Sequence, residues 1–125
     1  MKFALCNEVF QDLPIEDGFS KIAEIGYQGV EIAPFTLKDN PLEISEEEAD
    51  RCLKAAQSCG LEIVGLHWLM AKTEGLHLTS HDPDKRRAAS DYLRKLASLT
   101  ARMRGTIMVL GLSLIHISEP TRLSV

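Results

Sequence analysis

One short phrase occurs three times in the sequence, as Ile25-Gly26-Tyr27, Cys59-Gly60-Leu61 and Arg104-Gly105-Thr106. Each time it stands where an amphipathic segment gives way to an apolar run. Glycine directly after a helical pattern is typical of a helix end, because glycine adopts the left-handed conformation needed there at little cost. The apolar run that follows is typical of a strand. The phrase therefore predicts a repeating order of helix, glycine and strand.

The segments around these phrases predict seven elements. Apolar residues at helical spacing predict three helices, and short apolar runs predict four strands. Two of the helices also carry start signals, a capping box at Ser45 with Glu48 and an N-cap with a first-turn proline at Asp82-Pro83. The predicted helices span residues 14–25, 46–59 and 83–104, and the predicted strands span residues 2–6, 27–32, 61–67 and 106–110.

Strands that alternate with amphipathic helices predict an α/β fold with a parallel sheet. Two closures of such a sheet are common, an open doubly wound sheet and a (β/α)₈ barrel. A complete barrel takes about 250 residues, whereas this chain has 125. Four strands and three helices therefore fit either a small doubly wound domain or the N-terminal half of a (β/α)₈ TIM barrel.

Composition excludes several classes of protein. Hydrophobic residues make up 45% of the chain and charged residues 26%, as in a globular domain. The 14 basic and 18 acidic residues form no one-signed patch, so we expect no nucleic-acid partner. Neither a membrane span nor a signal peptide is evident, and we expect a cytoplasmic protein without a membrane partner. Cys6, Cys52 and Cys59 lack metal-ligand spacing and are expected to be reduced thiols.

The pattern of helix and strand stops after Gly111. The string Leu112-Ser113-Leu114-Ile115-His116-Ile117-Ser118-Glu119-Pro120-Thr121-Arg122 resembles, at every residue, the translation of a transposase-type sequencing adapter. We therefore expect residues 1–111 to be a partial barrel and residues 112–125 to be a non-native tail. This favours the half barrel over the doubly wound domain.

Four further segments carry a resemblance to a known family. Together they resemble bacterial sugar-phosphate isomerase/epimerase proteins of the xylose-isomerase-like TIM-barrel superfamily, over nearly the whole chain up to Gly111. The segments are Phe3-Ala4-Leu5-Cys6-Asn7-Glu8, Gly26-Tyr27-Gln28-Gly29-Val30-Glu31-Ile32-Ala33-Pro34-Phe35, Gly60-Leu61-Glu62-Ile63-Val64-Gly65-Leu66-His67-Trp68 and Gly75-Leu76-His77-Leu78-Thr79-Ser80.

The resemblance implies a reaction. Members of the superfamily bind a divalent metal, often Mn²⁺, Mg²⁺ or Co²⁺, through carboxylates and a histidine near the ends of later strands. Two carboxylates flank the sugar or sugar phosphate and move a proton alpha to its carbonyl. Those strands would lie beyond Gly111, so we assign no catalytic residue and no metal ligand. We expect the chain itself to be inactive and metal-free; the choice between isomerase and epimerase, and the oligomeric state, stay open.

Candidate substrate-binding residues lie where the first three predicted strands end, the position at which barrel enzymes keep their sites. Glu31 is expected to reach into the barrel mouth, and His67 and Trp68 to contact the sugar. Asn7 and Glu8 follow the first strand and are also candidates. A structural role stays open for each, as an ion pair, a hydrogen-bonded histidine, a packed aromatic ring, or a turn or cap.

The interior of the barrel is expected to receive one set of strand residues, among them Leu5, Val30, Ile63 and Val109. Two other functions stay open. One is an apurinic-site endonuclease-like hydrolase of the same superfamily, which His67 favours as a zinc ligand and the acidic net charge of -4 disfavours. The other is a non-catalytic fragment.

Overall fold

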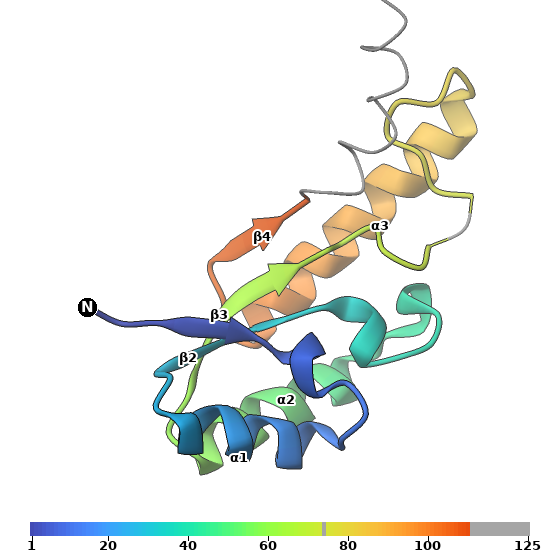
Figure 1. Ribbon diagram of the computed structural model, residues 1–125. Coiled ribbons are helices and arrows are strands. Elements are labelled where there is room, and N and C mark those ends of the chain that lie inside the picture. Colours follow the sequence, from blue (N-terminus) through green and yellow to red (C-terminus); the bar gives the residue numbers. More distant parts are fainter. Residues whose placement is uncertain (74, 111–125) are drawn as a thin grey trace, which may run out of the picture.

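The computed structural model describes residues 1–73 and 75–110 (Figure 1). The predicted non-native tail at residues 112–125 lies outside the described residues. The α/β prediction is confirmed, and every predicted helix and strand is present with small shifts at its ends. The strands are β1 (Ala4–Cys6), β2 (Gly29–Ile32), β3 (Glu62–His67) and β4 (Ile107–Val109), and the helices are α1 (Ile15–Ile25), α2 (Glu46–Ser58) and α3 (Pro83–Arg102).

Three short 3₁₀ helices were not predicted. They are η1 (Asn7–Phe10), η2 (Pro34–Thr36) and η3 (Pro41–Glu43). The first follows β1 and the other two follow β2, so all three lie in connections that leave the carboxyl end of a strand. Among the described residues, no helix is both long and apolar enough to cross a bilayer.

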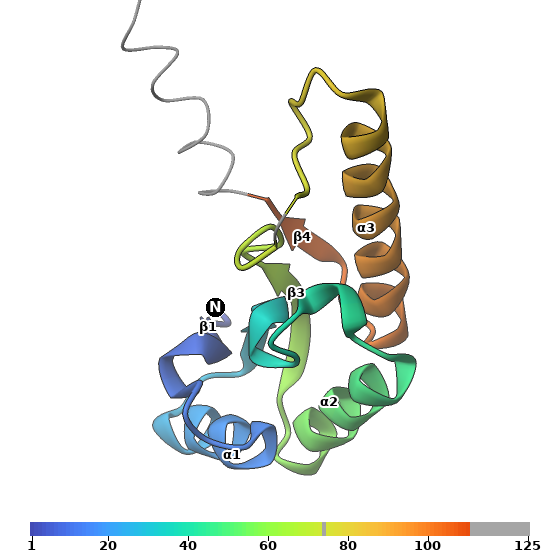
Figure 2. The ribbon, with the colours of Figure 1, turned by 90° about the vertical axis from the view of Figure 1, so that its right-hand side faces the viewer.

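The sheet has the strand order β1-β2-β3-β4, and each neighbouring pair is parallel. Figures 1 and 2 show the strands side by side, with helices packed along the sheet. A doubly wound sheet reverses its strand order at a switch point, and this order has no reversal. It is the order of the first four strands of a (β/α)₈ barrel. The half-barrel prediction is therefore confirmed.

Both predicted helix N-caps are present. Ser45 Oγ accepts a hydrogen bond from the Glu48 amide at 3.2 Å, and the Glu48 carboxylate accepts one from the Ser45 amide at 2.8 Å. Asp82 Oδ1 accepts a hydrogen bond from the Asp84 amide at 2.9 Å, with Pro83 in the first turn. These side chains satisfy amide groups that the helix itself leaves without partners.

The helix C-termini agree with the predicted glycine stops in two cases of three. Gly26 and Gly60 have φ angles of 115° and 75°, in the left-handed region. After α3 the left-handed residue is Arg104, with a φ of 63°, and not Gly105. Gly105 is needed for a different reason: a Cβ added to it would lie 3.0 Å from the Cα of Gly65 on β3. The third glycine therefore permits close packing between backbones.

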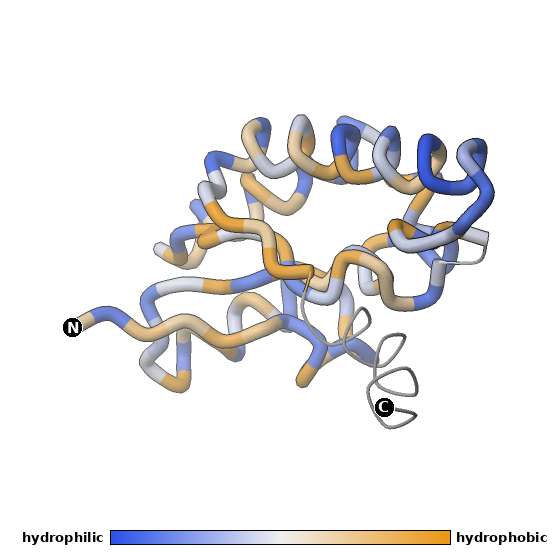
Figure 3. Tube along the Cα trace, turned by 90° about the horizontal axis from the view of Figure 1, so that it is seen from above, coloured by the Kyte–Doolittle hydropathy of each residue, from blue (hydrophilic) through white to orange (hydrophobic). Residues whose placement is uncertain are grey.

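One core cluster fills the space between the helices and one face of the sheet. Val30 and Ile32 of β2, together with Phe19 and Ile22 of α1, are 0% exposed. In Figure 3 the strands carry much of the apolar colour, whereas the first turns of the longest helix are hydrophilic. The core also contains residues from α2, α3 and β3, namely Ala49, Cys52, Ala55, Ala56, Ile63, Leu66, Ala89, Tyr92, Leu96 and Leu99.

The opposite face of the sheet, here called the inner face, would line the interior of a closed barrel. The prediction that Leu5, Val30 and Ile63 lie on it is wrong, because all three pack in the helix-side core. Val109 pairs with His67 and does lie on the inner face. Strands of three to six residues with apolar side chains on both faces give no alternation from which to choose a face. The choice depends on where the helices pack.

Candidate functional site

The carboxyl ends of β2 and β3 bring Glu31 and His67 to the inner face. Glu31 pairs with Cys6 of β1 on one side and with Gly65 of β3 on the other. Its neighbours Val30 and Ile32 are completely buried on the helix side, whereas Glu31 is partly exposed. His67 follows Gly65 by two residues, so it shares the same face. Alternation along the strands therefore places a carboxylate and an imidazole on the same face of neighbouring strands.

A register shift in β3 contributes to this arrangement. Val30 pairs with Ile63 but Glu31 pairs with Gly65, so Val64 is an extra residue between the two pairs. Such bulges re-aim the side chains that follow them. Without the extra residue, His67 would have fallen on the helix side. Glu31 and His67 do lie near the carboxyl ends of their strands, as predicted. The bulge in β3 brings the two side chains to the same face of the sheet.

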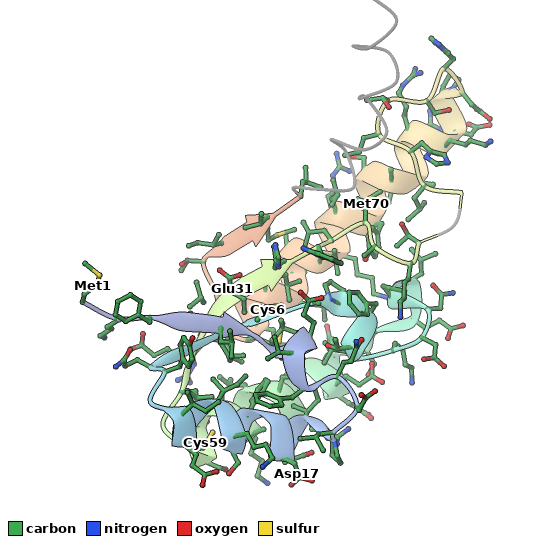
Figure 4. All side chains as sticks on the ribbon, viewed as in Figure 1. Met1, Cys6, Asp17, Glu31, Cys59 and Met70 are labelled. Carbon is green, nitrogen blue, oxygen red and sulfur yellow. The ribbon has the colours of Figure 1, made fainter. Side chains whose placement is uncertain are left out.

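Cys6 lies near two carboxylates at this edge, those of Glu8 and Glu31. Burial raises the pKa of the Cys6 thiol, and the nearby carboxylates of Glu8 and Glu31 also raise it, although a hydrogen bond to the backbone acts in the other direction. The thiol therefore stays protonated, which argues against a role as a nucleophile. Figure 4 labels Cys6 and Glu31 on neighbouring strands, away from Asp17 on α1.

Asn7 links the ends of β1 and β2. It is 4% exposed, its Oδ1 accepts a hydrogen bond from the Ala33 amide at 3.0 Å, and its Nδ2 donates one to Thr36 Oγ1 at 2.8 Å. Thr36 in turn donates to the Ala33 carbonyl at 2.6 Å. The side chain thus holds η2 beside the sheet edge. A direct substrate contact by Asn7 or by Glu8 stays a prediction.

His67 and Trp68 form an aromatic cluster with Phe35. The ring centroids of His67 and Trp68 are 5.8 Å apart, and those of Phe35 and Trp68 are 6.2 Å apart. His67 Nδ1 and Trp68 Nε1 are both buried, and neither has a hydrogen-bond partner in the described part of the chain. Two such atoms in adjacent residues are unusual, because buried polar atoms are nearly always paired.

Lys72 belongs to the same cluster but was not predicted. Its ammonium nitrogen lies 4.7 Å from the centroid of the Phe35 ring, a cation–π geometry. The lysine has a φ of 58°, and Trp68 has a φ of 59°. No sequence signal marks this lysine, because its contact with Phe35 joins two loops that follow different strands.

The part of the chain that the structure describes holds no preformed metal site. Among residues 1–73 and 75–110, no group of three or more His, Cys, Asp or Glu side chains is placed to hold a metal ion. These residues alone therefore do not fit the divalent metal that the family resemblance implies.

Comparison with known proteins places the chain in a family. A family model described as a xylose isomerase-like TIM barrel matches residues 19–122. The match covers most of the chain, which therefore belongs to the xylose isomerase-like TIM-barrel family. No curated protein matches the chain. The resemblance noted in the sequence is thus confirmed at the level of the superfamily.

Proposed function

We propose that this chain supplies the first half of the substrate-binding mouth of a divalent-metal-dependent sugar or sugar-phosphate isomerase or epimerase. Such an enzyme moves a proton alpha to a carbonyl. Membership of the xylose isomerase-like family supports the proposal. The observation that carries it is the placement of Glu31 and His67 on the same inner face, near the carboxyl ends of neighbouring strands.

The chemistry of this edge suits a polyhydroxylated ligand. The Glu31 carboxylate can accept hydrogen bonds from sugar hydroxyls, and the aromatic rings of Trp68 and Phe35 can cover an apolar sugar face. Sugar sites combine an apolar lining with a few placed polar groups in this way. The carboxylates of Glu8 and Glu31, close enough to affect Cys6, disfavour the phosphate backbone of a nucleic acid.

The remaining parts of the proposal concern the cofactor and the compartment. We propose that in the full-length parent Mn²⁺, Mg²⁺ or Co²⁺ is held by residues of later strands of the barrel, and we expect this chain alone to show no turnover. A cytoplasmic location is proposed because Cys6, Cys52 and Cys59 are all free thiols, as is usual in a reducing compartment.

A ligand titration followed by NMR tests the proposal. The probes are a neutral ketose, a ketose phosphate and a DNA duplex with an abasic site. We expect the sugars to shift the amide signals of Glu31 and His67 in a saturable way, and the duplex to leave them unchanged. Glu31→Gln should weaken sugar binding about ten- to hundredfold, since a hydrogen bond to a charged group is typically worth about 1.5–3 kcal/mol.

Glu62→Gln is the matched control. Glu62 also lies on a strand, but at the amino end of β3, where it pairs with Lys2 at 3.4 Å. We expect sugar affinity to be unchanged in this variant. Equal losses in both variants would count against a mouth at the carboxyl ends. Binding of the abasic duplex at His67, without sugar binding, would support the endonuclease-like hydrolase instead. Absence of all binding would support a non-catalytic fragment.

A further inference from the structure

The inner face of the sheet lies opposite all three α-helices. The strand order advances by one strand at each step, and right-handed crossovers then place α1, α2 and α3 on the same side. All-parallel sheets are almost always covered on both faces. Within residues 1–73 and 75–110, only the helix side has such a cover, and Ile107 on the inner face is 48% exposed. The inner face therefore lacks the second layer that a sheet of this type needs.

The two edge strands are suited to pairing with further strands. β1 reads Ala4-Leu5-Cys6 and β4 reads Ile107-Met108-Val109, so neither contains a charged residue or a proline. Edge strands that remain unpaired usually carry charges, prolines or bulges that block a further strand. Phe3, directly before β1, is 58% exposed. Both edges therefore present unblocked strands with apolar side chains.

The helix side of the sheet is also incomplete at each edge. Val30 and Leu66 on the central strands are 0% and 2% exposed. Their register partners on the edge strands, Leu5 and Met108, are only partly buried. A further strand beside β1 and another beside β4 would supply apolar neighbours that these two side chains lack within the described part of the chain.

The direction of the strands decides which partner fits both edges. A second copy, rotated by half a turn about an axis along the strands, keeps every strand parallel and places its β1 beside β4 and its β4 beside β1. The combined strands then follow the order of a (β/α)₈ barrel, whose interior is just wide enough for side chains to fill. Pairing of like edges, β4 with β4, runs antiparallel and leaves both β1 strands open. Only the first arrangement closes both edges and covers the inner face of each copy.

We propose that the inner face and the β1 and β4 edges form an interface with a second copy of this chain, so that two chains close one barrel with two-fold symmetry. Two-fold symmetry is the commonest in soluble oligomers. Each copy contributes its own Glu31 and His67 to the mouth, because both lie on the inner face near the carboxyl ends of their strands. One chain alone therefore forms half of this mouth. The interface does not depend on which ligand the mouth binds.

Charge pairing across the interface tests this arrangement. Ala4 and Ile107 are the first residues of β1 and β4, and strand alternation places both on the inner face. In the proposed dimer they lie at the same end of neighbouring strands, one from each copy. Sedimentation velocity over a range of concentrations should show a monomer and a discrete dimer for the native chain, with no larger species.

Ala4→Lys and Ile107→Glu should each weaken the dimer about tenfold, since either charge enters both of the new strand pairings. The double variant Ala4→Lys/Ile107→Glu should regain most of that loss, because opposite charges then meet at both junctions. Ala4→Lys/Ile107→Lys is its matched control, which brings like charges together and should remain monomeric. The two double variants differ at a single residue, so a general cost of these substitutions to folding is common to both.

Three outcomes would overturn the proposal. Equal dimerisation of the two double variants would show that β1 of one copy does not lie beside β4 of the other. Species that grow beyond a dimer with concentration would show open-ended pairing of edges in place of a closed barrel. A native chain that stays monomeric at every concentration would show that the two edges do not take a second copy. The native measurement needs no variant, so it decides even where a variant fails to fold.

Discussion

Gly65 is the residue on which the pairing of β3 with β4 depends most directly. A Cβ added to Gly65 would overlap the carbonyl group of Ile107 on β4. The overlap involves backbone and not the end of a flexible side chain, so only displacement of β4 can relieve it. The position therefore admits no side chain while the two strands remain paired.

We expect Gly65→Ala to lower the free energy of unfolding by about 3 kcal/mol or more, at the upper end of overpacking costs. Gly60→Ala is the matched control, because a Cβ there would meet nothing within 4 Å and the cost is only that of its φ of 75°. That cost should be about 1–2 kcal/mol. Urea unfolding of both variants measures the difference. Equal losses would show that β4 is not held against Gly65 in solution.

Cys52 predicts how stability depends on alkaline pH. The residue is 1% exposed, and burial raises the pKa of its thiol from 9.0 to about 12. Between these values the unfolded thiol ionises while the folded one keeps its proton. The contribution to stability is therefore complete below pH 9.0 and is lost as the pH rises toward 12, by up to about 1.4 kcal/mol per unit.

Urea unfolding at a series of pH values above 9 tests this expectation, with Cys52→Ala as the comparison. The slope of stability against pH should be shallower in the variant, whatever its absolute stability. Burial also raises the pKa of Tyr92 from 10.0 to about 12. This side chain therefore lowers the free energy of unfolding only above the pH at which the unfolded phenol ionises. Parallel slopes for the two proteins between pH 9 and pH 10 would show that Cys52 is not buried as described.

At the scale of elements, α2 is joined to both neighbouring helices by ion pairs. Arg51 on α2 contacts Glu16 on α1 at 2.7 Å, and Asp50 on α2 accepts from Arg102 on α3 at 2.7 Å. The hydrogen bond from Arg51 lowers the pKa of Glu16 to about 2. The side chains are about half exposed, so each pair contributes little, typically below about 1 kcal/mol. The packing of the helices therefore depends mainly on the shared buried core, to which α1, α2 and α3 all contribute.

The capping box of α2 should contribute more than either ion pair. We expect Ser45→Ala to lower the free energy of unfolding by about 1 kcal/mol, because the Glu48 amide loses its partner. Ser58→Ala is the matched control in the last turn of the same helix, where the hydroxyl donates to the Lys54 carbonyl at 2.9 Å. Backbone hydrogen bonds of the helix already satisfy the Lys54 carbonyl, so Ser58→Ala should leave the free energy of unfolding nearly unchanged. Chemical unfolding of both variants shows whether the loss comes from the missing cap or from any serine-to-alanine change in this helix. A Ser58→Ala variant as destabilised as Ser45→Ala would contradict the capping explanation.

At the scale of the whole molecule, the sheet has two edges that are open within the described residues. β1 pairs only with β2, and β4 pairs only with β3. Large apolar side chains lie near both edges, with Phe3 58% exposed before β1 and Ile107 48% exposed on β4. Unpaired apolar strands favour pairing with another chain.

We therefore expect this chain to self-associate, as a dimer or as larger species. Sedimentation velocity at several concentrations measures the association. Ile107→Lys should shift the distribution toward monomer, since a charge on an edge strand opposes pairing. Lys85→Gln is the matched control, because Lys85 is exposed on the first turn of α3 and not on an edge strand, and it should leave the distribution unchanged. A monomer with a single sharp transition in calorimetry would refute the expectation.

Much of the fold could be predicted from local patterns. The repeated helix, glycine and strand phrase predicted the α/β order, and Ser45 and Asp82 predicted where helices begin. These features depend on residues close together in the chain, as capping and periodicity do. The positions of Glu31 and His67 at strand ends followed from the same patterns.

The sequence by itself thus determined the order of the elements and their approximate extent, because these depend on local spacing, and a resemblance of four segments indicated the family. Only the tertiary structure decided which strand residues face the helices, since Val30 and Ile63 are apolar like the residues of the other face. It also decided that Gly105 serves a close approach, and that Lys72 lies over Phe35. These facts depend on contacts between segments far apart in the chain, and no local pattern encodes the distance between them.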